Sequence, residues 1–190
     1  MQTQQPEKVA TTANPDVLEM LDRFGLAQLS FINLIQKRPA MDDNEVMAFA
    51  AVCGIKVEPP FWSNAKPFAD HLWDVIGRYK LEPFFQRLTQ AYGGGSGDHY
   101  LMRPRGMDWG SSEQSELPKG LANWRAAYRK LDTPHQLMVA TILQLYLQGE
   151  DHYWMVRVPK IWHAADGVDE LRRAGFLADW ARLYALYPGW

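Results

Sequence analysis

A short phrase occurs twice in this 190-residue chain, and the order of the residues around it constrains the fold more than any other feature. The two copies are Asp98-His99-Tyr100-Leu101-Met102-Arg103-Pro104 and Asp151-His152-Tyr153-Trp154-Met155-Val156-Arg157-Val158-Pro159. Upstream, a Trp, a basic-Leu pair, a proline and a Tyr recur in the same order, as Trp73, Lys80-Leu81, Pro83 and Tyr92 and then as Trp124, Lys130-Leu131, Pro134 and Tyr146. This order predicts two equivalent helix-helix-extended units, each covering the apolar face of the other. The alternative is chance recurrence of a tripeptide.

The length and composition predict one compact domain. A typical domain has roughly 100 to 200 residues, and this chain is 47% apolar and 13% aromatic. We expect a flexible polar N-terminus at 1–14, an N-terminal helical segment at 15–62, and repeat-like units at 63–110 and 120–163. A C-terminal helix is expected within 164–190.

Charge and cysteine content narrow the class of protein. The chain, with a net charge of -2, lacks the strong positive charge that is typical of nonspecific nucleic-acid binding, although the sequence leaves room for a local basic patch. The single Cys53 excludes an intramolecular disulfide and a cysteine-based zinc site, and its apolar neighbours predict a buried thiol. No apolar run approaches the roughly 18 residues of a membrane span, and no basic-then-apolar leader opens the chain. We therefore expect a cytoplasmic protein without a membrane span.

Helical periodicity dominates the chain. Asn14-Pro15 begins one predicted helix that continues to about Gln36. Asp42 or Asp43 caps a second helix that ends at Gly54. Further helices are predicted at about 65–80, 83–92, 121–131, 133–148 and 168–186. Within the predicted helix 133–148, residues 137–147 are apolar nearly all round, which is typical of a central buried helix.

Two short segments have the pattern of strands. Residues 152–159 alternate β-branched and aromatic side chains, and the shorter segment 99–103 matches them, so the two strands could pair with each other. The predicted fold class is therefore α+β, helix-dominated with a small sheet. An all-α fold is the alternative.

The two Asp-His pairs are the candidate catalytic residues: Asp98, His99, Asp151 and His152. A carboxylate beside an imidazole can position a metal or a general base. Neighbouring residues of a regular strand point to opposite faces, so each pair could act together only at a turn between loop and strand. The competing interpretation is structural, with Asp capping the turn and His packing against a helix.

Glycines, cations and aromatic residues form the candidate binding segments. The glycine-rich loop around Gly95 could cradle a phosphate, but it follows a helix, whereas phosphate loops run from a strand into a helix. Two segments mix cations with aromatic rings, a combination that grips phosphate, stacks on bases or forms protein hot spots. Solvated charges beside core tryptophans would look the same. These candidate partner- or phosphate-binding residues are Arg103, Arg105, Trp109, Arg157, Lys160 and Trp162.

Two classes of function follow. The leading hypothesis is a regulatory or inhibitory protein that binds a macromolecular partner, most simply another protein, as an interference factor of a bacterial plasmid or phage would. The alternative is a phosphodiester-directed enzyme or DNA-binding factor, such as a nuclease or nucleotide hydrolase, that uses the Asp-His pairs and the adjacent cations. The cofactor is unknown, and the sequence leaves catalysis, oligomeric state and partner identity undetermined.

Overall fold

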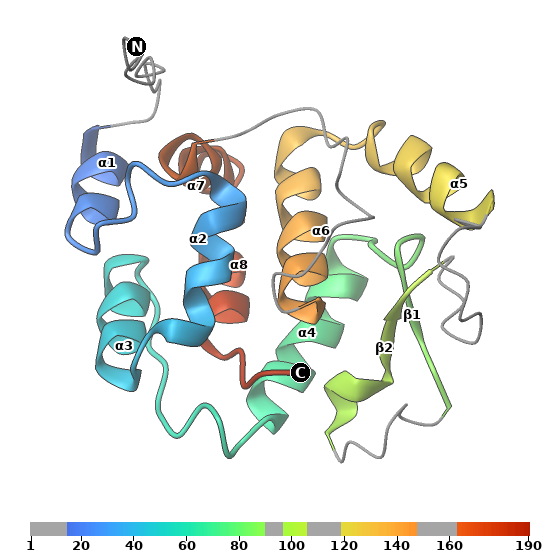
Figure 1. Ribbon diagram of the computed structural model, residues 1–190, viewed down its shortest axis with the longest axis horizontal. Helices are drawn as coiled ribbons and strands as arrows, with labels where there is room; N and C mark the ends of the chain where they lie inside the picture. Colours follow the sequence, from blue (N-terminus) through green and yellow to red (C-terminus); the bar gives the residue numbers. More distant parts are fainter. Residues whose placement is uncertain (1–14, 90–96, 106–118, 148–162) are drawn as a thin grey trace, which may run out of the picture.

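The computed structural model describes residues 15–89, 97–105, 119–147 and 163–190. Within these ranges the chain forms eight α-helices and one two-stranded antiparallel sheet, so the predicted helix-dominated α+β class is confirmed. Figure 1 shows α1 and α3 at one side of the molecule and the sheet with α5 at the other, with α2, α4, α6 and α8 between them. The helices are α1 (Pro15–Asp22), α2 (Phe31–Lys37), α3 (Asp43–Val52), α4 (Lys66–Arg78), α5 (Lys119–Tyr128), α6 (Thr133–Tyr146), α7 (Ala164–Arg173) and α8 (Leu177–Ala185).

The first predicted helix is divided into α1 and α2. Gly25 adopts a φ of +64°, in the left-handed region that favours glycine, and ends the first apolar run. The Ser30 side chain then accepts a hydrogen bond from the Asn33 backbone amide and starts α2. The prediction of one continuous helix over 15–36 is therefore wrong. The apolar residues keep helical spacing on both sides of Gly25, so their periodicity alone does not reveal the turn at this glycine.

The capped helix α3 follows the sequence signals closely. The Asp42 carboxylate accepts a hydrogen bond from the Glu45 amide, and the Glu45 carboxylate accepts one from the Asp42 amide, which makes a full capping box. Gly54 has a φ of +78° just after the helix end. Both predicted boundaries are confirmed. Residues 55–61 continue without regular structure, as the prolines in this segment predict.

The segment after α4 is a strand, which corrects the helix predicted over 83–92. Strand β1 (Phe85–Arg87) pairs antiparallel with β2 (Met102–Pro104), with Gln86 opposite Arg103. The Trp124 indole donates a hydrogen bond to the Phe84 carbonyl, and the two rings meet edge to face at 5.4 Å. These contacts come from distant parts of the chain and override the local helical preference.

The predicted strand over 99–103 begins later than expected. Residues Asp98–Leu101 form the 3-10 helix η3, and β2 follows it directly. The expected partner strand, 152–159, lies outside the described residues, and β2 pairs with β1.

The two proposed repeat units differ where they can be compared. Pro83 precedes β1, whereas its counterpart Pro134 lies in the first turn of α6. The predicted equivalence of two helix-helix-extended units therefore fails at this point. His99 lies in η3, and its counterpart His152 is outside the described residues.

Helix α6 is the centre of the core, as its apolar character predicts. Every residue from Leu137 to Leu145 is buried, and α6 packs against α2, α7 and α8. Its buried hydroxyl is satisfied, because Thr141 donates to the Leu137 carbonyl and accepts a 2.9 Å hydrogen bond from the Trp180 indole. The hydroxyl of this apolar helix is thus paired on both sides.

The C-terminal helix predicted from 168 to 186 is also two helices. Gly175 has a φ of +77° and separates α7 from α8. The glycine break lets both helices pack on the core, with α7 against α1, α2 and α6 and α8 against α3 and α4. A single straight helix could not make both sets of contacts.

The central position of α6 predicts the cost of a cavity within it. Leu143 is fully buried, so Leu143→Ala should lower the free energy of unfolding by about 2 to 5 kcal/mol. Urea melts measure this, with Leu18→Ala, a partly buried α1 position, as the milder control. A loss below about 1 kcal/mol at Leu143 would contradict its place in the core.

Candidate functional site

Asp98 and His99 lie in η3, at the junction between a loop and strand β2. The sequence predicts that the two side chains could act together only at such a junction. The Trp73 indole on α4 donates a 3.2 Å hydrogen bond to the Asp98 carbonyl and so ties η3 to this helix. The Asp98 side chain is 64% exposed and lies 3.4 Å from the Arg87 guanidinium, whereas His99 is only 2% exposed. The two side chains therefore have different surroundings, although both line one hollow.

The His99 ring is packed among aromatic side chains. Its centroid lies 5.7 Å from Phe68, 4.2 Å from Tyr100 and 5.3 Å from Trp190. The close approach depends on Gly97, where an added Cβ would lie 2.6 Å from the imidazole. This packing agrees with the structural interpretation of the Asp-His-Tyr phrase.

Burial also sets the charge of His99. Neither ring nitrogen makes a hydrogen bond of normal geometry to a described residue. Burial lowers the pKa of His99, and the nearby Gly189 backbone and the Asp98 carboxylate oppose this shift only in part. At neutral pH the imidazole is therefore uncharged.

A hollow lies next to His99 and is lined by residues that the structure describes. It has a volume of about 530 Å³ and combines side chains from the loop before α4, the first turns of α4, η3 and the C-terminal tail. We call it the Trp62 pocket. Its lining residues are Trp62, Ser63, Asn64, Ala65, Lys66, Ala69, Asp70, Gly97, Asp98, His99, Tyr100, Pro188 and Gly189.

Trp62 has the most exposed large apolar side chain of the described residues. It is 47% exposed, and among large apolar side chains there only Val52 is also exposed. The Arg38 guanidinium carbon lies 5.3 Å from the Trp62 ring centroid, at cation–π distance. Trp62 therefore contacts a buried cation and also lines the pocket.

Arg38 itself is fully buried, and its partners are backbone carbonyls. Its Nε donates to the Tyr184 carbonyl, and its Nη2 donates to the carbonyls of Ala185 and Tyr187, over 2.9 to 3.0 Å. Nη1 has no hydrogen-bond partner among the described residues. Burial lowers the pKa of Arg38, but the negative end of the α8 dipole favours its charged form.

The cations predicted to bind phosphate do not line the Trp62 pocket. Arg103 lies on β2 with Nε and Nη2 buried and unpaired within the described part of the chain. Arg105 donates to the Glu82 carbonyl at 2.5 Å. The structure therefore does not bring these two cations to Asp98 and His99 in the pocket lining. The remaining predicted site residues lie outside the described ranges: Gly95, Trp109, Asp151, His152, Arg157, Lys160 and Trp162.

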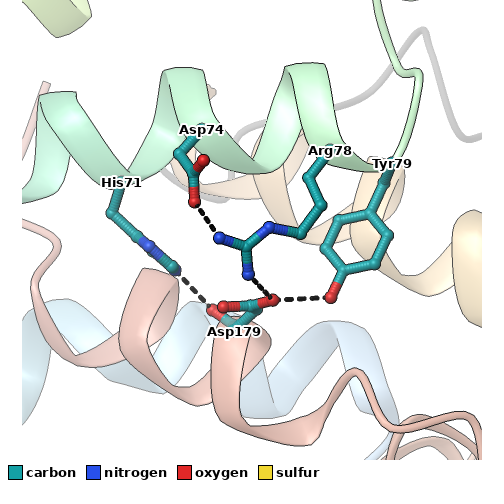
Figure 2. A network of polar contacts seen from close by, with 5 residues as sticks. All are labelled: His71, Asp74, Arg78, Tyr79 and Asp179. Atoms are coloured by element: carbon teal, nitrogen blue, oxygen red, sulfur yellow. Dashed lines mark hydrogen bonds and ion pairs between the residues drawn. The ribbon is translucent and has the colours of Figure 1, made fainter.

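A second polar cluster joins α4 to α8, on residues that sequence analysis left without a functional role. Figure 2 shows Arg78 and Tyr79 directed at the Asp179 carboxylate, with contacts of 2.7 and 2.6 Å. His71 Nε2 lies 2.9 Å from the Asp179 carbonyl oxygen, and Arg78 also pairs with Asp74. Each of these groups is satisfied within the cluster, so its role is to hold α4 against α8.

Sequence analysis missed Trp62 and Arg38. Trp62 follows Pro59-Pro60 and precedes Ser63-Asn64, so its surroundings in the sequence are typical of an exposed loop, and that signal could have marked it. Arg38 offers no such signal, because its carbonyl partners are about 146 to 149 residues away. Within the described ranges, no three His, Cys, Asp or Glu residues are grouped as metal ligands would be.

Comparison of the chain with known protein families, curated proteins and solved structures finds no match. Its function is therefore inferred from the geometry of the site. Among the residues that the structure describes, no helix has the length and apolar character needed to cross a membrane.

The buried imidazole predicts a pH dependence of stability. The pKa of His99 in the folded state is below its ordinary value of 6.5, so below about pH 6.5 the unfolded chain takes up a proton more readily. The free energy of unfolding should therefore fall as the pH falls below this value. His71 has a pKa lowered by burial and contributes in the same direction.

His99→Phe keeps a ring in this position and removes the proton-binding group. Urea melts from pH 8 to pH 5 should give the variant a shallower loss of stability than the original protein, while the pH 8 values stay similar. Adding His71→Gln should reduce the slope further. An unchanged slope in His99→Phe would contradict the buried, neutral state of this imidazole.

Proposed function

We propose that this protein is a cytoplasmic regulatory or inhibitory protein that acts by binding another protein, and that the Trp62 pocket is the contact site. The observation that carries the proposal is the exposed indole of Trp62 on the wall of the 530 Å³ hollow. Tryptophan is enriched among the few interface residues that contribute most of the binding energy, particularly where a pocket accepts a partner side chain. Regulation by occupying a partner, as in a plasmid or phage interference factor, needs no further chemistry in this chain.

The surroundings of Trp62 support this proposal. Arg38 below the ring is held by three carbonyls, so the indole is placed on a rigid support and loses little conformational entropy on binding. The lining also offers polar side chains such as Ser63 and Asn64, which suit the mixed polar and apolar character of protein interfaces. A free thiol at the buried Cys53 is compatible with a reducing compartment.

The environment of His99 favours binding over general-base catalysis at the described Asp-His pair. Asp98 is paired with Arg87, and His99 is enclosed by aromatic rings with both nitrogens buried. A general base must reach the proton that it removes. This geometry supports the binding hypothesis ahead of the phosphodiester-directed alternative.

Site-specific photocrosslinking in the native host tests the proposal. A benzoylphenylalanine placed at Ser63, which is exposed in the pocket lining, should capture a discrete partner, whereas the same group at Asp22 on α1 should not. Trp62→Ala should weaken capture by about 2 kcal/mol or more, the usual scale of an interface hot spot.

The chemical nature of the crosslinked species decides between the hypotheses. A protease-sensitive, nuclease-resistant adduct that depends on Trp62 supports protein binding. An adduct destroyed by nuclease would overturn it in favour of the nucleic-acid alternative. Equal capture at Ser63 and Asp22 would remove the Trp62 pocket as the contact site.

A further inference from the structure

The Trp62 pocket has a charge balance that selects among partner side chains. Its lining contains two carboxylates, Asp70 and Asp98, and one ammonium, Lys66. Lys66 lies 2.7 Å from Asp70, so these two charges offset each other. Asp98 lies 3.4 Å from Arg87 and also attracts Lys66 at longer range, and its side chain is 64% exposed. The lining thus has one more carboxylate than ammonium group, and a partner cation could reach the exposed Asp98 side chain.

The aromatic wall adds a second requirement. Trp62 is exposed and lines the same hollow as the two carboxylates, together with Tyr100 and the uncharged ring of His99. A flat cation can stack on an indole and also form two parallel hydrogen bonds to a carboxylate. Arginine meets both requirements, whereas lysine provides a compact, strongly hydrated point charge.

The positive charge of the buried Arg38 would repel a second cation at Trp62. Its guanidinium lies 5.3 Å from the ring centroid. Its charge, however, is directed into three carbonyls at the end of α8, where the helix dipole is negative. The cost of bringing another cation to the exposed part of the ring is therefore reduced.

We infer that the protein partner inserts an arginine side chain into the Trp62 pocket, where its guanidinium stacks on Trp62 and pairs with Asp98. This inference rests on the proposed function and specifies the chemistry of the partner. It also gives a role to an exposed carboxylate and an exposed indole that line the same hollow.

Peptide titrations followed by NMR test the inference on the full chain. Acetyl-Gly-Arg-Gly-amide should produce saturable shifts of the Trp62 indole and of residues 97–100, with a dissociation constant of about 1 mM, as expected for one side chain. The citrulline peptide has nearly the same shape without the charge and should bind about tenfold more weakly. The lysine peptide should fall between them.

Matched variants locate the binding group. Asp98→Asn should weaken binding of the arginine peptide by about fivefold to tenfold, whereas Glu82→Gln, which removes the same charge from an exposed residue outside the pocket lining, should leave it unchanged. Trp62→Leu should abolish the shifts. The spectra of the free variants show directly whether each one is folded.

The outcomes separate this inference from the proposed function. Equal binding of arginine and citrulline peptides, unchanged affinity in Asp98→Asn, or no saturable shifts at a peptide concentration of about 20 mM would overturn the arginine assignment. Protein capture at Ser63 would still stand in each of these cases. Loss of protein capture at Ser63 together with arginine-specific shifts would instead contradict the proposed function.

Discussion

The buried guanidinium of Arg38 is the interaction on which the rest of the structure depends. It lies just after α2, yet its three hydrogen bonds go to the last carbonyls of α8 and to the tail beyond it. A helix leaves its final carbonyls without partners inside the helix, and a cation placed there satisfies them and complements the dipole. Burying the charge alone would cost several kcal/mol, so the hydrogen bonds must be kept for the fold to be stable.

Other polar contacts reinforce the same junction. The Tyr184 hydroxyl donates to the Leu34 carbonyl of α2, and the Tyr187 hydroxyl donates to the Leu145 carbonyl of α6. Three helices that are distant in sequence therefore meet around the end of α8. The tail that follows contributes Pro188 and Gly189 to the Trp62 pocket, and Trp190 packs on His99. The hydrogen bonds of Arg38 to the end of α8 therefore also position the tail residues that line the pocket.

Local signals in the sequence predict much of this fold. The capping box of α3 and the all-round apolar surface of α6 are properties of neighbouring residues, and both predictions are confirmed. The long helices expected over 15–36 and 168–186 are divided at Gly25 and Gly175, because helical periodicity continues across a turn that only the backbone reveals. The helix expected after Pro83 is a strand, since its partner β2 comes from a distant segment.

The candidate site was predictable only in part for the same reason. The Asp-His-Tyr phrase directed attention to Asp98 and His99, which do line the pocket. Other parts of its lining, however, come from Trp62 and the tail, which the chain brings together from positions more than 100 residues apart. Arg103 is close to an aromatic residue in the sequence but does not line the pocket. Arg38 is distant from Trp62 in the sequence, and the fold brings its guanidinium to the Trp62 ring. Chemistry that depends on such long-range contacts cannot be inferred from residue spacing.

The most direct test of this account is the stability of Arg38→Met. Methionine keeps much of the apolar volume of the side chain but leaves three buried carbonyls without donors, so the free energy of unfolding should fall by about 3 to 5 kcal/mol. Arg23→Met, which removes an exposed ion pair between Glu19 on α1 and the residue after this helix, is the matched control and should cost less than about 1 kcal/mol. Urea melts of both variants, with amide hydrogen exchange over 184–190, give the comparison. A loss at Arg38 no larger than at Arg23, with unchanged exchange in the tail, would contradict the central role of this junction.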